Sequence, residues 1–268
     1  MQKNSILSLF VIGALVLTGC QREKNYTLKV DYSSQEQWVY SVEYTSQGLF
    51  TQNDSTTTLN TVIKGTLSGS TTTTDKLRMK VQNIQITSDM LNDEEKQQVT
   101  EKLADAEYDL VLQEGTPSVD TSAELPAGSF PEWDLYRQFA KLLPELPTTA
   151  VKPGFNWERT VTLPVRTMQG VVPCEIYRSY TFDSLYADNS AALISWQFRY
   201  STDKEVIDSS NLMKQIPVAG NGTGSALFDL KKKVITEAKM QFETPLAKIG
   251  EVSVNWREEA TLKLAGNE

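Results

Sequence analysis

Few residues of this chain belong to the types that usually carry out chemistry. The sequence contains no histidine, which excludes Ser-His-Asp and Cys-His catalysis and the usual zinc and copper ligand sets. Cys174 lies in a strand-like stretch and is expected to be a small buried hydrophobe rather than a nucleophile. Glu258 and Glu259 are neighbours on a predicted strand, so they point to opposite faces and cannot form a carboxylate dyad. We therefore expect no enzyme, no cofactor and no metal site.

Two short segments resemble binding motifs but are better explained as turns. Gly220-Asn-Gly-Thr-Gly224 is similar to a phosphate-binding loop, yet such a loop needs a helix after it. The strand-like SALFDL follows instead, so a flexible turn is expected here. Lys231-Lys232-Lys233 comes next and is expected to be the solvated tip of a hairpin.

Four tryptophans remain as candidate site residues. Trp38, Trp157, Trp196 and Trp256 all fall on apolar faces of alternating segments. We expect them to fill the core. The alternative is that two curved sheets leave an aromatic-lined cavity for an acyl chain or another apolar ligand.

The segments around these tryptophans alternate between apolar and polar residues. Between positions 192 and 200, Ile194, Trp196, Phe198 and Tyr200 share one face. Between 252 and 264, one side carries Val252, Val254, Trp256, Ala260, Leu262 and Leu264. One buried and one wet face is typical of antiparallel sheet. Two segments instead predict helices: 92–103, with Asn92 as N-cap, and 131–143, which has an apolar stripe.

The N-terminal segment is typical of an exported bacterial lipoprotein. The apolar run from Ile6 to Leu17 is too short to span a membrane and follows the basic Lys3. Leu17-Thr18-Gly19-Cys20 resembles the bacterial lipobox, so residues 1–19 are expected to be a signal peptide and Cys20 to carry the lipid anchor. Residues 20–36 then form a tether that leads into the first strand. Gln21 after the cysteine favours the outer membrane, on its periplasmic or outer side.

Charge and cysteine count narrow the partners further. The net charge of −8 becomes −9 once Lys3 is removed with the signal peptide, which disfavours a nucleic-acid partner. With Cys20 acylated, Cys174 has no cysteine with which to form an internal disulfide. The folded part must therefore rest on its core.

Three features recur in the same order along the chain. Trp38 and Trp157 each open a strand, 119 residues apart. Asp75-Lys76 and Asp188-Asn189 each precede a strand at an offset of 113, and a YDL and an FDL segment stand 120 residues apart. The fold is therefore predicted to be mainly β, with two similar antiparallel units, as curved sheets or half-barrels, from an internal duplication. We expect the first repeat at 37–125, a helical linker at 126–154 and the second repeat at 155–268.

These features together resemble a family of uncharacterised bacterial lipoproteins with duplicated, mostly β halves. The lipobox, the Trp-x-Tyr-x-Val strand opening, and the paired YDL and FDL segments carry the resemblance. Its most specific part is the junction formed by Leu146, Pro147, Val151, Lys152, Pro153, Gly154 and Trp157. The resemblance covers most of residues 26–266. It implies the architecture and brings no catalytic residues.

The sequence thus indicates a membrane-anchored envelope lipoprotein. The preferred interpretation is a non-enzymatic interaction or structural module with a protein partner. The alternative is a binder or carrier of an apolar ligand or lipid in a β cavity. A lipid anchor at Cys20 provides the contact with the membrane in both cases.

Overall fold

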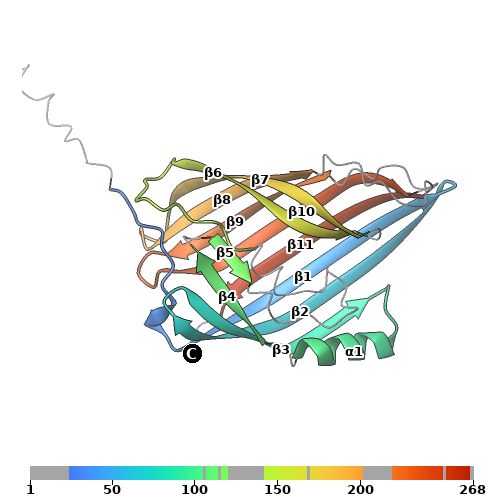
Figure 1. The fold of residues 1–268 in the computed structure, drawn as a ribbon, viewed down its shortest axis with the longest axis horizontal. Coiled ribbons are helices and arrows are strands. Elements are labelled where there is room, and N and C mark those ends of the chain that lie inside the picture. Colours follow the sequence, from blue (N-terminus) through green and yellow to red (C-terminus); the bar gives the residue numbers. More distant parts are fainter. Residues whose placement is uncertain are drawn as a thin grey trace, which may run out of the picture.

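Alternating apolar and polar residues produce long strands, which form a single sheet in a computed structural model of the chain (Figure 1). The structure describes residues 24–104, 107–113, 116–119, 142–167, 170–201, 219–249 and 252–265. The strands are β1 (Gln37–Gln52), β2 (Ser55–Thr73), β3 (Lys76–Ser88), β4 (Glu107–Gln113), β5 (Thr116–Val119), β6 (Asn156–Thr167), β7 (Gly170–Tyr186), β8 (Ala191–Ser201), β9 (Ala219–Asp229), β10 (Val234–Ile249) and β11 (Val252–Leu264). The helix α1 (Asp93–Ala104) and the 3-10 turn η1 (Tyr32–Ser34) accompany them, and Leu142, the first described residue after a gap, is also helical.

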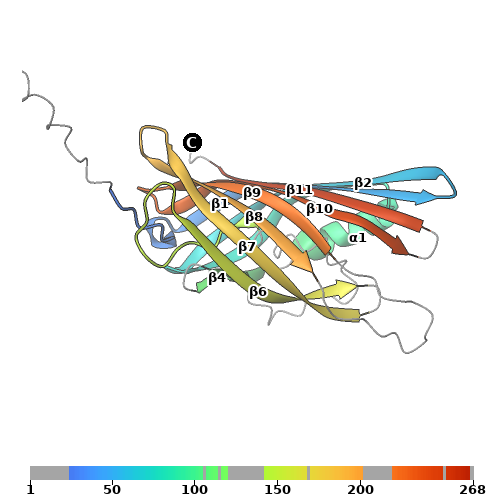
Figure 2. The same cartoon turned by 90° about the horizontal axis from the view of Figure 1, so that it is seen from above.

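The sheet has 11 strands in the order β5-β4-β3-β2-β1-β11-β10-β9-β8-β7-β6. All neighbouring strands run antiparallel, and nearly all are also neighbours along the chain. The exception is the pairing of β1 with β11, which runs from Tyr40–Leu264 to Thr51–Ser253. The fold is therefore mainly β and antiparallel, as predicted. Figures 1 and 2 show that the sheet is strongly curved, with β4 and β6 both turned to the same side.

The two halves of the chain do not form separate units, because the pairing of β1 with β11 joins β1–β5 and β6–β11 in one sheet. Most of the expected linker helix at 131–143 lies outside the described residues, which resume at Leu142. Trp38 and Trp157 do stand at equivalent places, as the second residues of β1 and β6. This arrangement does not show an internal duplication.

One face of the sheet, called here the inner face, carries the buried apolar side chains. Directly paired residues form a row across nine strands: Ile86, Ile63, Tyr44, Ala260, Met240, Gly224, Trp196, Tyr180 and Trp157. Similar residues continue the inner face on both sides of this row, among them Val42, Leu67, Ile194, Phe182 and Leu262, all buried. Burial of this many apolar side chains supplies the main free energy of folding.

The prediction of a flexible turn at Gly220–Gly224 was wrong. These residues belong to β9, where Gly222 pairs with Phe198 and Gly224 with Trp196 on β8. A Cβ on Gly224 would lie 2.1 Å from the Trp196 ring, so only a glycine leaves room for that ring to lie across β9. The alternate glycines are therefore packing partners of aromatic side chains.

The N-terminal segment, residues 24–36, crosses one end of the sheet, called here the proximal end. Tyr26 forms a two-bond bridge with Val151, and its ring meets the inner-face Phe182 edge-on at 6.0 Å. Further along, Asp31 N–H donates to the Lys233 carbonyl. This segment therefore ties together the turns at the proximal end. The opposite, distal end contains the turn Asn53–Asp54 between β1 and β2.

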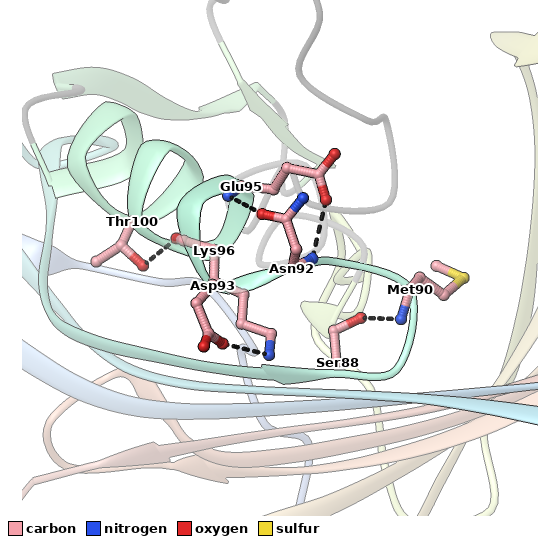
Figure 3. A network of polar contacts seen from close by, with 7 residues as sticks. All are labelled: Ser88, Met90, Asn92, Asp93, Glu95, Lys96 and Thr100. Atoms are coloured by element: carbon pink, nitrogen blue, oxygen red, sulfur yellow. Dashed lines mark hydrogen bonds and ion pairs between the residues drawn. The ribbon is translucent and has the colours of Figure 1, made fainter.

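The helix predicted at 92–103 is confirmed as α1, and a reciprocal capping box starts it (Figure 3). Asn92 Oδ1 accepts from Glu95 N–H at 2.9 Å, and Glu95 Oε2 accepts from Asn92 N–H at 2.9 Å. Just before the helix, Ser88 Oγ accepts from Met90 N–H at 3.1 Å. The apolar side of α1, through Val99 and Leu103, packs against the core next to β3.

Candidate functional site

Exposure of the inner face rises from the proximal to the distal end. Near the proximal end, the rings of Trp38, Phe182 and Phe228 are at most 1% exposed. Toward the distal end, Phe198 reaches 9%, and Phe242 is only partly buried. The inner face of the strands is thus more completely covered near the proximal end than near the distal end. Phe155 is an exception, because it precedes β6, stacks on Trp157 at 6.2 Å and is 39% exposed.

Four aromatic rings, the distal aromatic cluster, lie near the distal end. Phe50 and Trp256 meet edge-on at 6.2 Å, and Phe198 and Phe242 stack at 5.8 Å with an interplanar angle of 5°. Glycines make both pairs possible, because a Cβ on Gly48 would lie 2.5 Å from Trp256, and one on Gly222 would lie 2.3 Å from Phe198. Phe50, Trp256 and Phe242 are all partly buried, so apolar surface remains in contact with solvent.

A carboxylate lies between the two ring pairs. Glu258 faces Phe242 on β10 and Ser46 on β1, so all three side chains share the inner face. Trp256 Nε1 donates to Glu258 Oε1 at 3.1 Å. Ser46 is 5% exposed, and its Oγ has no hydrogen-bond partner within the described structure. The distal aromatic cluster therefore includes one charged group and one buried hydroxyl.

The four tryptophans named from the sequence occupy different environments. Trp38, Trp157 and Trp196 are buried, with Trp157 stacked on Tyr180 at 5.3 Å and 9°. Two of the indole nitrogens form buried hydrogen bonds with the backbone. Trp38 donates to the Tyr32 carbonyl at 3.1 Å, and Trp157 donates to the Glu145 carbonyl at 2.8 Å. Trp256 alone among the four is partly exposed and belongs to the distal aromatic cluster.

A buried ion pair fixes the segment that follows Leu142. Arg178 Nη1 lies 3.2 Å from Glu145 Oε1, and these side chains are 12% and 2% exposed. Arg178 also donates to the Tyr180 hydroxyl at 3.5 Å. Burial raises the pKa of Tyr180, so its phenol stays neutral beside this pair. The ion pair is satisfied by its own partners and holds structure rather than a ligand.

The outer face of the sheet is polar. A hollow of about 320 Å³ over β1, β2, β10 and β11 is rimmed by charged side chains. Two ion pairs line it: Lys64–Glu43 at 3.0 Å, between β2 and β1, and Lys239–Glu237 at 2.8 Å, along β10. Because exposed pairs of this kind are already matched and hydrated, we place no site on this face.

Other predicted features can be checked only in part. Cys20 lies outside the described residues, and Cys174 belongs to β7. Among the described residues, no helix is long and apolar enough to cross a membrane. In the same part of the chain, no three Cys, Asp or Glu side chains gather closely enough to hold a metal ion.

Comparison with known proteins supports the fold. A solved structure that describes lipid–protein interactions in lipovitellin aligns with 86% of this chain at a TM-score of 0.51 and 10% identity. The match covers 25% of the lipovitellin chain, so this protein spans about a quarter of its length. A structure of Pseudomonas aeruginosa OpdL aligns with a TM-score of only 0.19 and does not bear on the fold. No protein-family model and no curated protein matches the sequence.

Several members of the distal aromatic cluster were missed in the sequence. The alternation that starts at Trp38 extends to Ser46 and Phe50, and it could have been followed that far. The signal at Glu258 was clearer, because it is the one charged residue on the apolar face of 252–264. A charge at an inward position of an amphipathic strand costs free energy and therefore indicates a specific role.

Proposed function

We propose that this protein is a lipid-anchored envelope protein that binds an apolar ligand, such as the acyl chain of a lipid, at the distal aromatic cluster. One observation carries the proposal: the inner face continues as partly exposed aromatic rings at one end of the sheet. Apolar surface of this kind on an otherwise acidic protein indicates a binding site. The lipovitellin structure offers a related fold in which lipid–protein interactions are described.

The expected affinity follows from the area that a ligand would cover. Removing roughly 200 Å² of ligand and protein surface from water at about 25 cal/mol per Å² gives about 5 kcal/mol. Association entropy opposes part of this, so we expect dissociation constants of micromolar or weaker. Such an affinity suits transient holding or transfer of a lipid.

A neutral fluorescent probe tests the proposal. The mature chain, residues 20–268 with Cys20→Ser, keeps every described residue and carries no acyl chain of its own. We expect a long-chain alcohol probe to bind saturably and to quench tryptophan emission. Phe242→Ala should weaken binding several-fold, because it removes one face of the stacked Phe198 pair. Val39→Ala, on the exposed outer face, is the matched control. A folded protein that fails to bind the probe would show the proposal to be wrong.

An interaction or structural module remains the second candidate. The observation that favours it is β6, which pairs only with β7 among the described strands. An edge strand can accept a strand of another protein through its free backbone groups. Absence of probe binding together with a stable complex formed through this edge would favour this candidate.

The lipid anchor, the outer-membrane location and the duplication belong to the same proposal. The described contacts begin at Tyr26, six residues after Cys20, which leaves a short tether to the membrane. In support of a duplication, Met79 pairs with Tyr108 and Ala192 with Phe228, which matches the sequence offsets of 113 and 120. Superposition of β1–β4 on β6–β9 tests the duplication, and different strand paths would count against it.

A further inference from the structure

The inner face changes character at one row of paired residues. This row contains Ser88, Thr61, Ser46, Glu258, Phe242, Gly222, Phe198, Arg178 and Arg159. The neighbouring row toward the proximal end is apolar apart from the Tyr44 and Tyr180 hydroxyls. A ligand in the distal aromatic cluster would therefore meet polar groups at one level of the sheet. The chemistry of that level decides which head group fits.

In this row of described residues, one hydroxyl has no hydrogen-bond partner. Thr61 Oγ1 and Ser88 Oγ, which lie beside Ser46, hydrogen-bond to each other at 2.8 Å. Ser46 Oγ is buried without a hydrogen-bond partner in the described structure. A buried hydroxyl in this state costs free energy, and a donor from a ligand would recover it.

Glu258 sets the sign of the charge that fits. Its carboxylate lies directly across from Ser46, next to Phe242 on β10 and bonded to Trp256 on its own strand. A negative group beside two aromatic rings attracts cations, because the ring faces are also electron-rich. The Glu258 carboxylate would instead repel an anionic head group.

We infer that the site accepts an amphiphile with a primary ammonium head group, its N–H groups donating to Glu258 and to Ser46 Oγ and its chain lying on the aromatic rings. The inference rests on the proposed function, which it deepens by naming the head group. A primary ammonium suits both partners because it offers three donors and one positive charge. A carboxylate head group offers neither. A quaternary ammonium has the charge but no donor for Ser46.

A series of twelve-carbon probes tests the inference with the Cys20→Ser mature chain. Dodecanol, dodecylammonium, dodecyltrimethylammonium and dodecanoate each displace a neutral fluorescent probe, below their micelle concentrations. We expect dodecylammonium to displace at a concentration about tenfold lower than dodecanol, because charge-assisted hydrogen bonds form in the site. Dodecyltrimethylammonium should fall between these two, and dodecanoate should be the weakest.

Variants assign the preference to the named groups. Glu258→Gln should bring dodecylammonium to the level of dodecanol, because it removes the charge that distinguishes the two head groups. Ser46→Ala should weaken dodecylammonium but not dodecyltrimethylammonium, which cannot donate to it. The matched control is Glu259→Gln, the adjacent carboxylate on the outer face, which is paired with Arg257 at 3.0 Å. It should change nothing.

The outcomes separate the inference from the proposed function. If dodecanol binds but dodecanoate binds as tightly as dodecylammonium, or Glu258→Gln keeps the ammonium preference, the head-group inference is wrong and ligand binding stands. If none of the four amphiphiles displaces the probe, or the probe itself does not bind, the proposed function falls and the inference falls with it. The head-group series on the unmodified site needs no variant, so it decides the matter even if a substitution impairs folding.

Discussion

Replacement of Gly224 by alanine tests the packing of aromatic rings over glycines, on which the inner face depends. Gly224 lies between Trp196 on β8 and Met240 on β10. An added Cβ would lie 2.1 Å from Cε2 and 2.2 Å from Cζ2 of the Trp196 ring. That ring is 3% exposed and packs against Tyr180 with 6.2 Å between centroids. It cannot move without disturbing its neighbours.

The expected loss of stability is therefore that of an overpacked core. Such substitutions cost about 1–3 kcal/mol, which exceeds the gain of roughly 0.4–1 kcal/mol from replacing a glycine where space allows. Gly65→Ala supplies the matched control, because its Cβ would meet nothing closer than 3.7 Å. We expect Gly65→Ala to leave stability unchanged or slightly raised.

Urea unfolding, followed by tryptophan fluorescence and far-UV circular dichroism, measures the free energy of unfolding of both variants. On heating a chain of this size, each kcal/mol of stability lost should lower the melting temperature by about 2–4 °C. Gly224→Ala should also change the near-UV spectrum, since the Trp196 environment is altered. Equal stabilities of the two variants would refute the packing argument.

Three further predictions concern other parts of the molecule. Glu145→Gln should destabilise the protein by about 3–5 kcal/mol, because Arg178 is left buried without its carboxylate. Glu43→Gln, in the exposed pair with Lys64, should cost at most about 1 kcal/mol. Similar losses of unfolding free energy in urea for the two variants would contradict the burial of the first pair. Asn92→Ala should lower the stability by about 1 kcal/mol and speed hydrogen exchange of the backbone amides at the start of α1. Unchanged exchange there would contradict the capping box. Cys20→Ser in the full chain should remove the protein from the membrane fraction and leave the precursor unprocessed, while normal processing and retention would show the lipobox interpretation to be wrong.

Local patterns predicted the elements well because their causes are local. Alternation in 192–200 and 252–264 gave β8 and β11, and the acidic residues after Asn92 gave α1. The arrangement of strands was harder, since pairing depends on residues far apart in the chain. Nothing near Tyr40 indicates that it lies opposite Leu264, so one continuous sheet was not distinguishable from two units.

The glycines show the same limit at the level of single residues. A glycine in a sequence can mark a turn or a close approach of another side chain, and only the partner strand decides which. For Gly222 and Gly224 the partners are Phe198 and Trp196, about 25 residues earlier. Glu258 and Glu259 do point to opposite faces, as predicted. The position of Glu258 as the one charged residue on the apolar face of 252–264 was not recognised.

Pairing of rings with glycines helps to build the aromatic layer of the inner face. Trp196 lies opposite Gly224 and Trp256 opposite Gly48, so each of these two indoles can lie across a neighbouring bare backbone. At the proximal end, Leu28 and Tyr32 of the N-terminal segment cover this aromatic layer. At the distal end, the ring of Trp256 keeps part of its surface in contact with solvent.

The proposed lipid anchor at Cys20 would give this asymmetry a direction. Residues 24–36, which would follow the acylated Cys20, are fixed at the proximal end, while Phe50 lies 13 residues along β1 from Gln37, roughly 45 Å away at about 3.4 Å per residue. A tether of six residues from Cys20 to Tyr26 reaches only about 20 Å. With Cys20 acylated as proposed and the sheet upright on that anchor, the distal aromatic cluster would point away from the membrane. A ligand would then arrive from the aqueous side or from another protein, which suits a carrier that receives an amphiphile better than an enzyme that extracts one from its own bilayer.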